Sequence, residues 1–85
     1  MEYIAFITHA WRHYLDWQST DKKMVKKINE LVQNAMREPF LGLGKPEPLK
    51  GELTGYWSRR ITDKHRLVYR CEKGILYIVS CRGHY

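Results

Sequence analysis

Hydrophobic residues in this chain follow the period of a strand first, then of two helices, and then of strands again. Residues 2–7 are rich in aromatic and β-branched side chains and predict a strand that ends before Thr8. Thr8 is the expected N-cap of a helix over residues 9–18, in which large apolar residues recur at intervals of three or four.

A second helix is predicted from about Asp21 to Arg37, with one apolar stripe and a lysine-rich remainder. The stripe consists of Met24, Val25, Ile28, Leu31, Val32 and Ala35. Thr20 or Asp21 is expected to cap its start, and Pro39 prevents its continuation. We interpret the lysines as a solvated helix face rather than a phosphate site.

Residues 39–51 have a different composition, with three prolines and three glycines, which excludes regular structure. Four apolar side chains are expected to attach this loop to the body: Phe40, Leu41, Leu43 and Leu49. Loops of this length are uncommon in compact domains and are often functional.

Three further strands are predicted over about residues 56–62, 65–71 and 75–82, joined by tight turns into an antiparallel meander. The order β-α-α-β-β-β predicts an α+β fold: a twisted, mainly antiparallel sheet with two helices packed on one face. Eighty-five residues are too few for two cores, so we expect residues 1–85 to form one domain. A chain this small would gain stability from forming a homodimer or binding a partner tightly.

Positive charge is concentrated in the second half of the chain. Residues 1–44 contain six Lys or Arg and five Asp or Glu, a net charge of +1, whereas residues 45–85 contain nine and four, a net charge of +5. This field favours a polyanion such as nucleic acid, although an acidic protein would satisfy it too.

Neither the apolar runs nor the cysteines indicate a membrane or secreted protein. The longest apolar runs have five residues, whereas a membrane span needs about 20. Cys71 and Cys81 are expected at opposite ends of one hairpin, roughly 20 Å apart at ~3.3 Å per residue, too far for a disulfide. We therefore expect reduced thiols and a cytoplasmic location.

The predicted turns bring several arginines to one end of the sheet. Arg60 should lie near Arg66, and Arg66 should lie roughly opposite residues 80–82, so that Arg82 joins them. Three converging guanidinium groups favour a bound anion such as phosphate. Alternatively, these arginines face opposite sides of the sheet and pair with Asp63, Glu52 or solvent. The spacing alone gives both readings similar weight.

The remaining candidate residues are not diagnostic by themselves. Glu47 is held in extended backbone between Pro46 and Pro48, but an isolated loop carboxylate is usually only solvated. His9 and His13 share a helix face, yet a zinc site needs at least a third ligand, which the sequence does not supply. No serine or cysteine has a recognisable nucleophile context.

Several motifs together resemble a YoeB-type toxin of the RelE superfamily, over essentially the whole chain. They are GKPEPLK at residues 44–50, WSRRI at 57–61, HRLVY at 65–69 and the terminal CRGHY at 81–85. Gly83 departs from the pattern, because a bulky residue, often tyrosine, is expected before the final His-Tyr pair. This departure predicts a freer terminal segment.

The resemblance implies an endoribonuclease that cuts messenger RNA in the A site of the ribosome and is neutralised by a YefM-type antitoxin. On this resemblance Glu47 is the general base, Arg66 stabilises charge on the phosphate, and His84 is the general acid, assisted by Tyr85. Lys50 and Arg60 match further positions on the phosphate side of the family. The ribose 2′-hydroxyl supplies the nucleophile, so neither metal nor cofactor is expected.

Two other functions agree with parts of the sequence. A non-catalytic basic module could block translation by binding RNA or the ribosome through Lys50, Arg60, Arg66 and Arg82. A ParE-like toxin that acts on DNA gyrase would share the fold, but it needs neither the Glu47 loop nor the terminal His-Tyr pair.

Overall fold

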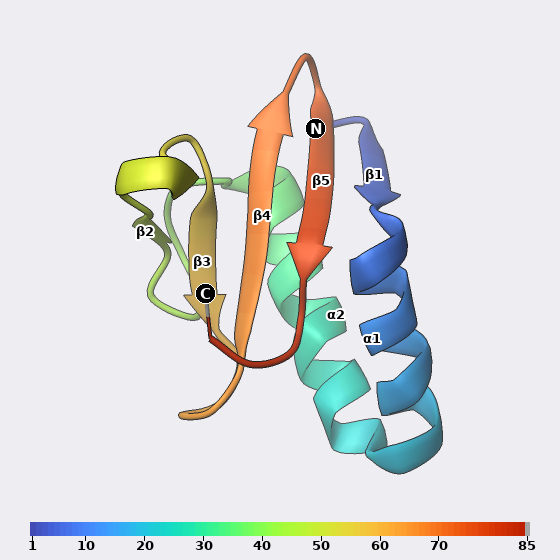
Figure 1. The fold of residues 1–85 in the computed structure, drawn as a ribbon. Coiled ribbons are helices and arrows are strands. Elements are labelled where there is room, and N and C mark those ends of the chain that lie inside the picture. Colours follow the sequence, from blue (N-terminus) through green and yellow to red (C-terminus); the bar gives the residue numbers. More distant parts are fainter. Residues whose placement is uncertain (85) are drawn as a thin grey trace.

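The computed structural model describes residues 1–84 of the chain, and its helices and strands are shown in Figure 1. In chain order they are β1 (Tyr3–Phe6), α1 (Thr8–Thr20), α2 (Lys22–Arg37), β2 (Glu47–Pro48), the 3₁₀ turn η1 (Gly51–Leu53), β3 (Trp57–Arg60), β4 (Arg66–Glu72) and β5 (Ile75–Ser80). The predicted α+β order is confirmed. The expectation that residues 39–51 lack regular structure is wrong at β2 and η1, because an extended Glu47–Pro48 segment pairs with β3.

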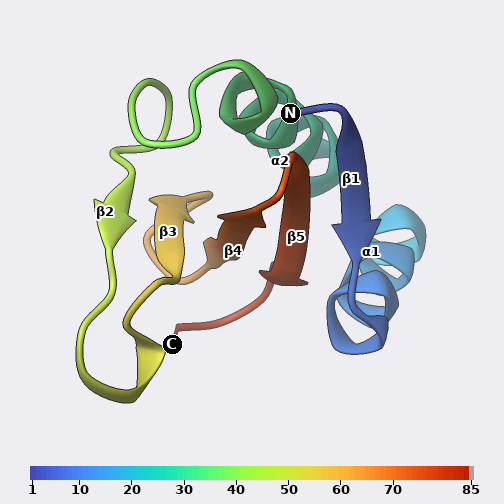
Figure 2. The same cartoon turned by 90° about the horizontal axis from the view of Figure 1, so that it is seen from above.

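The five strands form one mixed sheet in the order β1-β5-β4-β3-β2. β1 runs parallel to β5, whereas all other neighbours are antiparallel. Figure 2 shows the strands side by side in this order, with α2 over one face of the sheet and α1 beside β1 at its edge. The predicted α+β fold of two helices and one sheet is confirmed, and the face of β3 and β4 away from α2 has no helix over it.

The helix starts agree only partly with their predicted caps. Asp21 caps α2, because its carboxylate accepts hydrogen bonds from the backbone N–H groups of Lys23 and Met24. Thr8 does not cap α1: the helix begins at Thr8 itself, and the preceding Ile7 has no capping side chain. The Ile7 N–H donates to the Ile78 carbonyl of β5 at 3.0 Å, so a hydrogen bond to the sheet fixes the position where α1 begins.

The core lies between α2 and the sheet. Five residues of the predicted stripe are buried, and Val25 is only half-buried: the buried ones are Met24, Ile28, Leu31, Val32 and Ala35. They pack with apolar residues of the three central strands. Within residues 1–84, neither helix combines the length and apolar character needed to cross a bilayer.

A fully buried arginine attaches the loop after α2 to the body. The Arg59 guanidinium, with no solvent exposure, donates five hydrogen bonds. Its acceptors are Asn34 Oδ1, the Tyr69 hydroxyl and the carbonyls of Glu38, Leu41 and Leu43. Tyr69 in turn donates to the Pro39 carbonyl at 2.6 Å.

Side chains contribute less to this attachment than the apolar pattern predicts. Leu49 is buried and the ring of Phe40 contacts Trp57, with 4.7 Å between the ring centroids. Leu41 and Leu43, however, are 69% and 50% exposed, so the expectation that they attach the loop through their side chains is wrong. Their carbonyls are bound to Arg59 instead, which leaves their side chains pointing outward.

Replacing Arg59 by methionine should lower the free energy of unfolding by about 3–5 kcal/mol, because five acceptors lose their shared donor. Arg60 supplies the matched control: its side chain is 50% exposed. The R60M substitution should therefore change stability by less than about 0.5 kcal/mol. Urea denaturation measures both effects, and equal stability of the two variants would contradict the role given to Arg59.

Candidate active site

A small charged pocket lies where β2, β3 and β4 run side by side. Its volume is about 90 Å³, and it is lined by Lys45, Glu47, Ser58, Arg60 and Arg66. Three cations and one carboxylate therefore surround a space the size of a small anion. A larger hollow of about 550 Å³ lies along the outer surfaces of α1 and α2, but its amide and lysine side chains present no comparable convergence of arginines.

Sheet register brings the pocket residues together. Glu47 pairs with Ser58 across β2 and β3, and Arg60 pairs with Arg66 across β3 and β4, as the turn spacing predicts. Side chains alternate along a strand, so Ser58 and Arg60 share the pocket face while Arg59 enters the core. The helix-covered face thus receives one of two adjacent arginines and the open face receives the other.

The segment that carries Glu47 is bound to β3 on both sides. Before it, the Gly44 carbonyl accepts from the Arg60 N–H at 2.7 Å; after it, the Leu49 N–H donates to the Tyr56 carbonyl at 2.9 Å. Gly44 has a φ of +80°, and a Cβ there would lie 2.8 Å from Leu31 Cδ2. Only glycine therefore lets the loop pass this close to α2.

The two pocket arginines differ in how they are held. Nη1 of Arg66 donates to the carbonyls of Thr62, Asp63 and His65, at 2.5, 3.2 and 3.1 Å. Arg60 lies 3.6 Å from the exposed Asp63 carboxylate, a weak surface pair. The structure therefore contains part of both predicted arrangements, the anion site and the surface ion pair. Arg60 lines the pocket and also approaches Asp63.

The chain after β5 returns to this end of the sheet. In Figure 1 it passes below the lower end of β4 towards β3. Backbone N–H of Arg66 donates to the Gly83 carbonyl at 3.0 Å, and the Gly83 N–H donates to His65 Nδ1 at 2.8 Å. The terminal segment is therefore held up to Gly83, contrary to the freer segment that a glycine predicts. His84 follows directly and is exposed, and the predicted catalytic Tyr85 lies outside the described residues.

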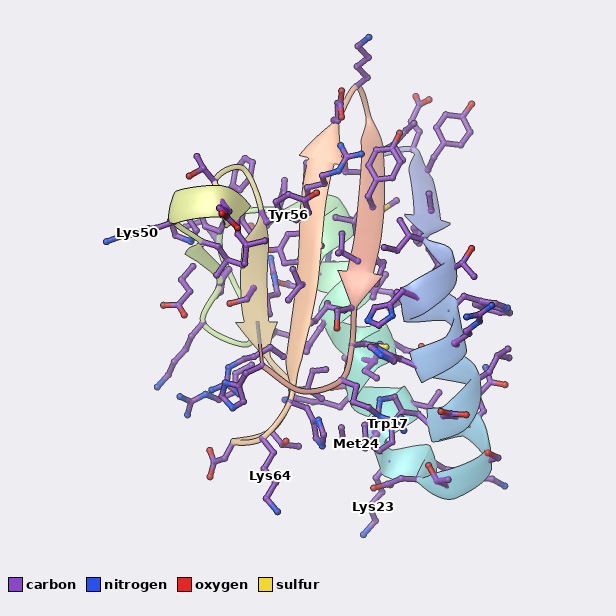
Figure 3. The ribbon with its side chains drawn as sticks, viewed as in Figure 1. Trp17, Lys23, Met24, Lys50, Tyr56 and Lys64 are labelled. Carbon is purple, nitrogen blue, oxygen red and sulfur yellow. The ribbon has the colours of Figure 1, made fainter. Side chains whose placement is uncertain are left out.

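Two predicted substrate-binding residues do not line the pocket. Arg82 turns towards α1, where it lies 3.3 Å from Asp16 and 4.8 Å above the Trp17 ring. Lys50 follows β2 and extends away from the body in Figure 3. The pocket thus unites Glu47, Arg60 and Arg66, while Lys50 and Arg82 lie outside it.

The histidines and the cysteines form no metal-binding cluster within residues 1–84, and both thiols have raised pKa values. The described part of the chain contains no group of three His, Cys, Asp or Glu placed to hold a metal, although the rings of His9 and His13 lie 4.3 Å apart. Burial raises the pKa of the Cys81 thiol to about 12, so it is neutral at physiological pH. Cys71 is also a free thiol with a pKa raised by burial.

Comparison with known proteins identifies the chain's relatives. The family described as "YoeB-like toxin of bacterial type II toxin-antitoxin system" matches residues 6–85. The chain belongs to this family. It is 59% identical over 76 residues to Toxin YoeB of Escherichia coli K12, covering 89% of the chain and 90% of the relative. It is 54% identical over 82 residues to Toxin YoeB of Streptomyces coelicolor, covering 96% and 98%.

Solved structures of YoeB toxins have the same fold. A YoeB/ParE toxin from Agrobacterium tumefaciens superposes with a TM-score of 0.94 at 54% identity, covering 98% of this chain and 99% of that one. A YoeB–YefM heterotetramer from Staphylococcus aureus gives 0.91 at 49% identity, covering 100% and 99%, and a YoeB dimer from the same organism gives 0.91 at 50%, covering 98% and 97%. The resemblance in the motifs is therefore confirmed.

Two residues of the pocket in this YoeB-family chain were not among the sequence candidates. Ser58 is buried, and strand alternation alone would have assigned it to the side of Arg60. Lys45 has a φ of +52°, an unusual conformation for a side-chain-bearing residue. It belongs to the GKPEPLK motif, but composition gives no sign that it turns into the pocket.

The pocket should bind a small anion at low ionic strength. Inorganic phosphate is expected to shift the backbone resonances of Ser58, Arg60 and Arg66 and the guanidinium resonances of the two arginines in NMR spectra. Its oxygens can accept paired N–H groups of a guanidinium. The R66M variant should weaken binding at least tenfold. R70M is the control, since Arg70 pairs with Glu72 elsewhere on β4. Unchanged phosphate binding by R66M would contradict this assignment.

Proposed function

We propose that this toxin is an endoribonuclease that cuts messenger RNA in the ribosomal A site. The observation that carries the proposal is the shared pocket of Glu47, Arg60 and Arg66, beside which the terminal segment presents His84. A carboxylate, two guanidinium groups and an imidazole are the residue types that metal-independent cleavage of a ribose-phosphate linkage requires.

The proposed reaction is attack of the ribose 2′-oxygen on the adjacent phosphorus. Glu47 takes the 2′-hydroxyl proton, and the 2′-O–P bond forms while the P–O5′ bond breaks. His84 gives a proton to the leaving 5′-oxygen, assisted by Tyr85. The products are a 2′,3′-cyclic phosphate and a 5′-hydroxyl, and water takes no part in this step.

The cations have separate proposed roles. Arg66 is restrained by three carbonyls, so its guanidinium is preorganised towards the charge that develops on the non-bridging oxygens. Arg60 shares the pocket and holds the same phosphate. Lys50 and Arg82 lie outside it and bind neighbouring phosphates of the strand, with Arg82 exchanging its exposed contact with Asp16 for RNA.

The proposed partners follow from this site and from the relatives. The pocket is small, so positioning of the RNA is assigned to the 30S subunit within the 70S ribosome, in the cytoplasm. The structures of YoeB with YefM from Staphylococcus aureus support neutralisation by a YefM-type antitoxin, whose acidic segment would cover the basic end of the sheet. The YoeB dimer from that organism supports a homodimer of this chain.

A single 2′-deoxy sugar at the scissile position should abolish cleavage on the ribosome, because the nucleophile is removed. Matched all-ribose and 2′-deoxy messages are compared by mapping their ends after incubation with the toxin and 70S ribosomes. Efficient cutting of the deoxy message would refute the mechanism. Inhibition of translation without any scission would instead indicate the non-catalytic RNA-binding alternative.

Alanine at Arg66 or His84 should lower the cleavage rate by about 10²–10⁴-fold and abolish toxicity. R70A is the matched control: Arg70 is on β4 like Arg66, but it stacks 4.0 Å above Tyr77 and pairs with Glu72. All three variants should still bind the antitoxin, measured by co-purification. Full toxicity of both R66A and H84A would show that the assigned residues are wrong.

A further inference from the structure

The backbone just before His84 is held by an imidazole that the proposed reaction does not use. His65 Nδ1 accepts the Gly83 N–H at 2.8 Å, while the next residue, Arg66, donates its N–H to the Gly83 carbonyl at 3.0 Å. Two consecutive residues therefore bind both polar groups of Gly83. With a φ of +74°, Gly83 also sets the direction in which the chain continues to His84.

Accepting this hydrogen bond requires one protonation state of His65. A lone pair must be present on Nδ1, so the ring is neutral and carries its proton on Nε2. The ring also meets the edge of Trp17 from α1, with 5.0 Å between centroids and an interplanar angle of 78°. Trp17 in turn donates Nε1–H to the Cys81 carbonyl at 2.9 Å, which anchors the same segment two residues earlier.

The surroundings of His65 favour the neutral state. Burial lowers its pKa below 6.5, and the positive charges of Arg82, Lys64 and His84 lower it further. Arg82 and His84 lie on the terminal segment, Lys64 on the turn before β4, and α1 contributes the uncharged indole of Trp17. Asp16 of α1 pairs with Arg82.

We propose that neutral His65 is the positioning residue for His84: its Nδ1 fixes the Gly83 peptide and thereby aims the general acid at the leaving oxygen. This inference rests on the proposed ribonuclease function. It gives two histidines opposite requirements, since His84 must carry a proton to act and His65 must not. Protonation of His65 turns its Nδ1 into a donor facing the Gly83 N–H, and the terminal segment is released.

The consequence for pH has a definite sign. Because the pKa of His65 is lowered, the anchor is intact at neutral pH and is lost as the pH falls below 6.5 through that lowered value. The single-turnover rate of wild-type toxin on ribosomes should therefore fall on the acid side. The part of this fall that follows the midpoint of His65 should disappear when His65 is replaced. The losses caused by protonating the base Glu47 and by deprotonating the general acid should remain in every variant.

Two substitutions separate positioning from packing. H65N places an amide oxygen at the position of Nδ1 and cannot titrate, so it should keep the rate within about threefold of wild type and lose the part of the acid limb that follows the His65 midpoint. H65L keeps the bulk but has no acceptor, so kcat should fall by about 10–100-fold with KM little changed, because the acid is misplaced. H9N, which removes an exposed imidazole of α1, should leave the rate and its pH profile unchanged.

An NMR titration of wild-type toxin tests the anchor independently of activity. The ¹⁵N shifts of His65 should show an unprotonated Nδ1 at pH 7.5, and the Gly83 amide should titrate with the same midpoint as His65. A protonated Nδ1 at pH 7.5, or folded H65L with wild-type rate and pH profile, would overturn the proposal. If wild-type toxin cut no RNA, the proposed function would fall, whereas the His65–Gly83 anchor would still be decided by these spectra.

Discussion

The buried guanidinium of Arg59 is the interaction on which the geometry of this toxin depends. Buried charges are costly unless every donor is satisfied. Here the acceptors are mostly backbone carbonyls of the loop that leaves α2, together with Asn34 and Tyr69. The loop is therefore attached through its main chain, by a network that bends it back over β3. Arg60 follows Arg59 directly on β3. Arg59 therefore holds the loop while its neighbour Arg60 supplies a cation to the pocket.

The attachment of this loop determines where Glu47 lies. Gly44 passes close to Leu31 and bonds to Arg60, and three residues later Glu47 pairs with Ser58. Backbone hydrogen bonds before and after Glu47, of 2.7 and 2.9 Å, therefore hold its carboxylate beside the arginines. In the proposed reaction such preorganisation would favour catalysis, since charges already in position need no reorganisation when the reaction occurs.

The other half of the proposed site depends on the C-terminal segment. Cys81 is buried and its N–H and carbonyl contact His13 and Trp17, whereas Gly83 is bound by His65 and Arg66. Histidines thus serve as hydrogen-bond acceptors for alternate residues of this segment. Burial, with the charges of His9 and Arg82, also lowers the pKa of His13, opposed by Asp16, so this second imidazole favours the neutral state as well.

The sequence by itself determined the two helices, the strands other than β2, the apolar stripe of α2, the antiparallel meander and the family, because these depend on local periodicity and contiguous motifs. Tertiary structure alone decided which of two adjacent arginines is buried, that Arg82 turns to Asp16, and that His65 binds Gly83. Arg59 and Asn34 are 25 residues apart, and His65 and Gly83 are 18 apart. Such partners are chosen by sheet register and by the face that the helices cover, which no local pattern encodes.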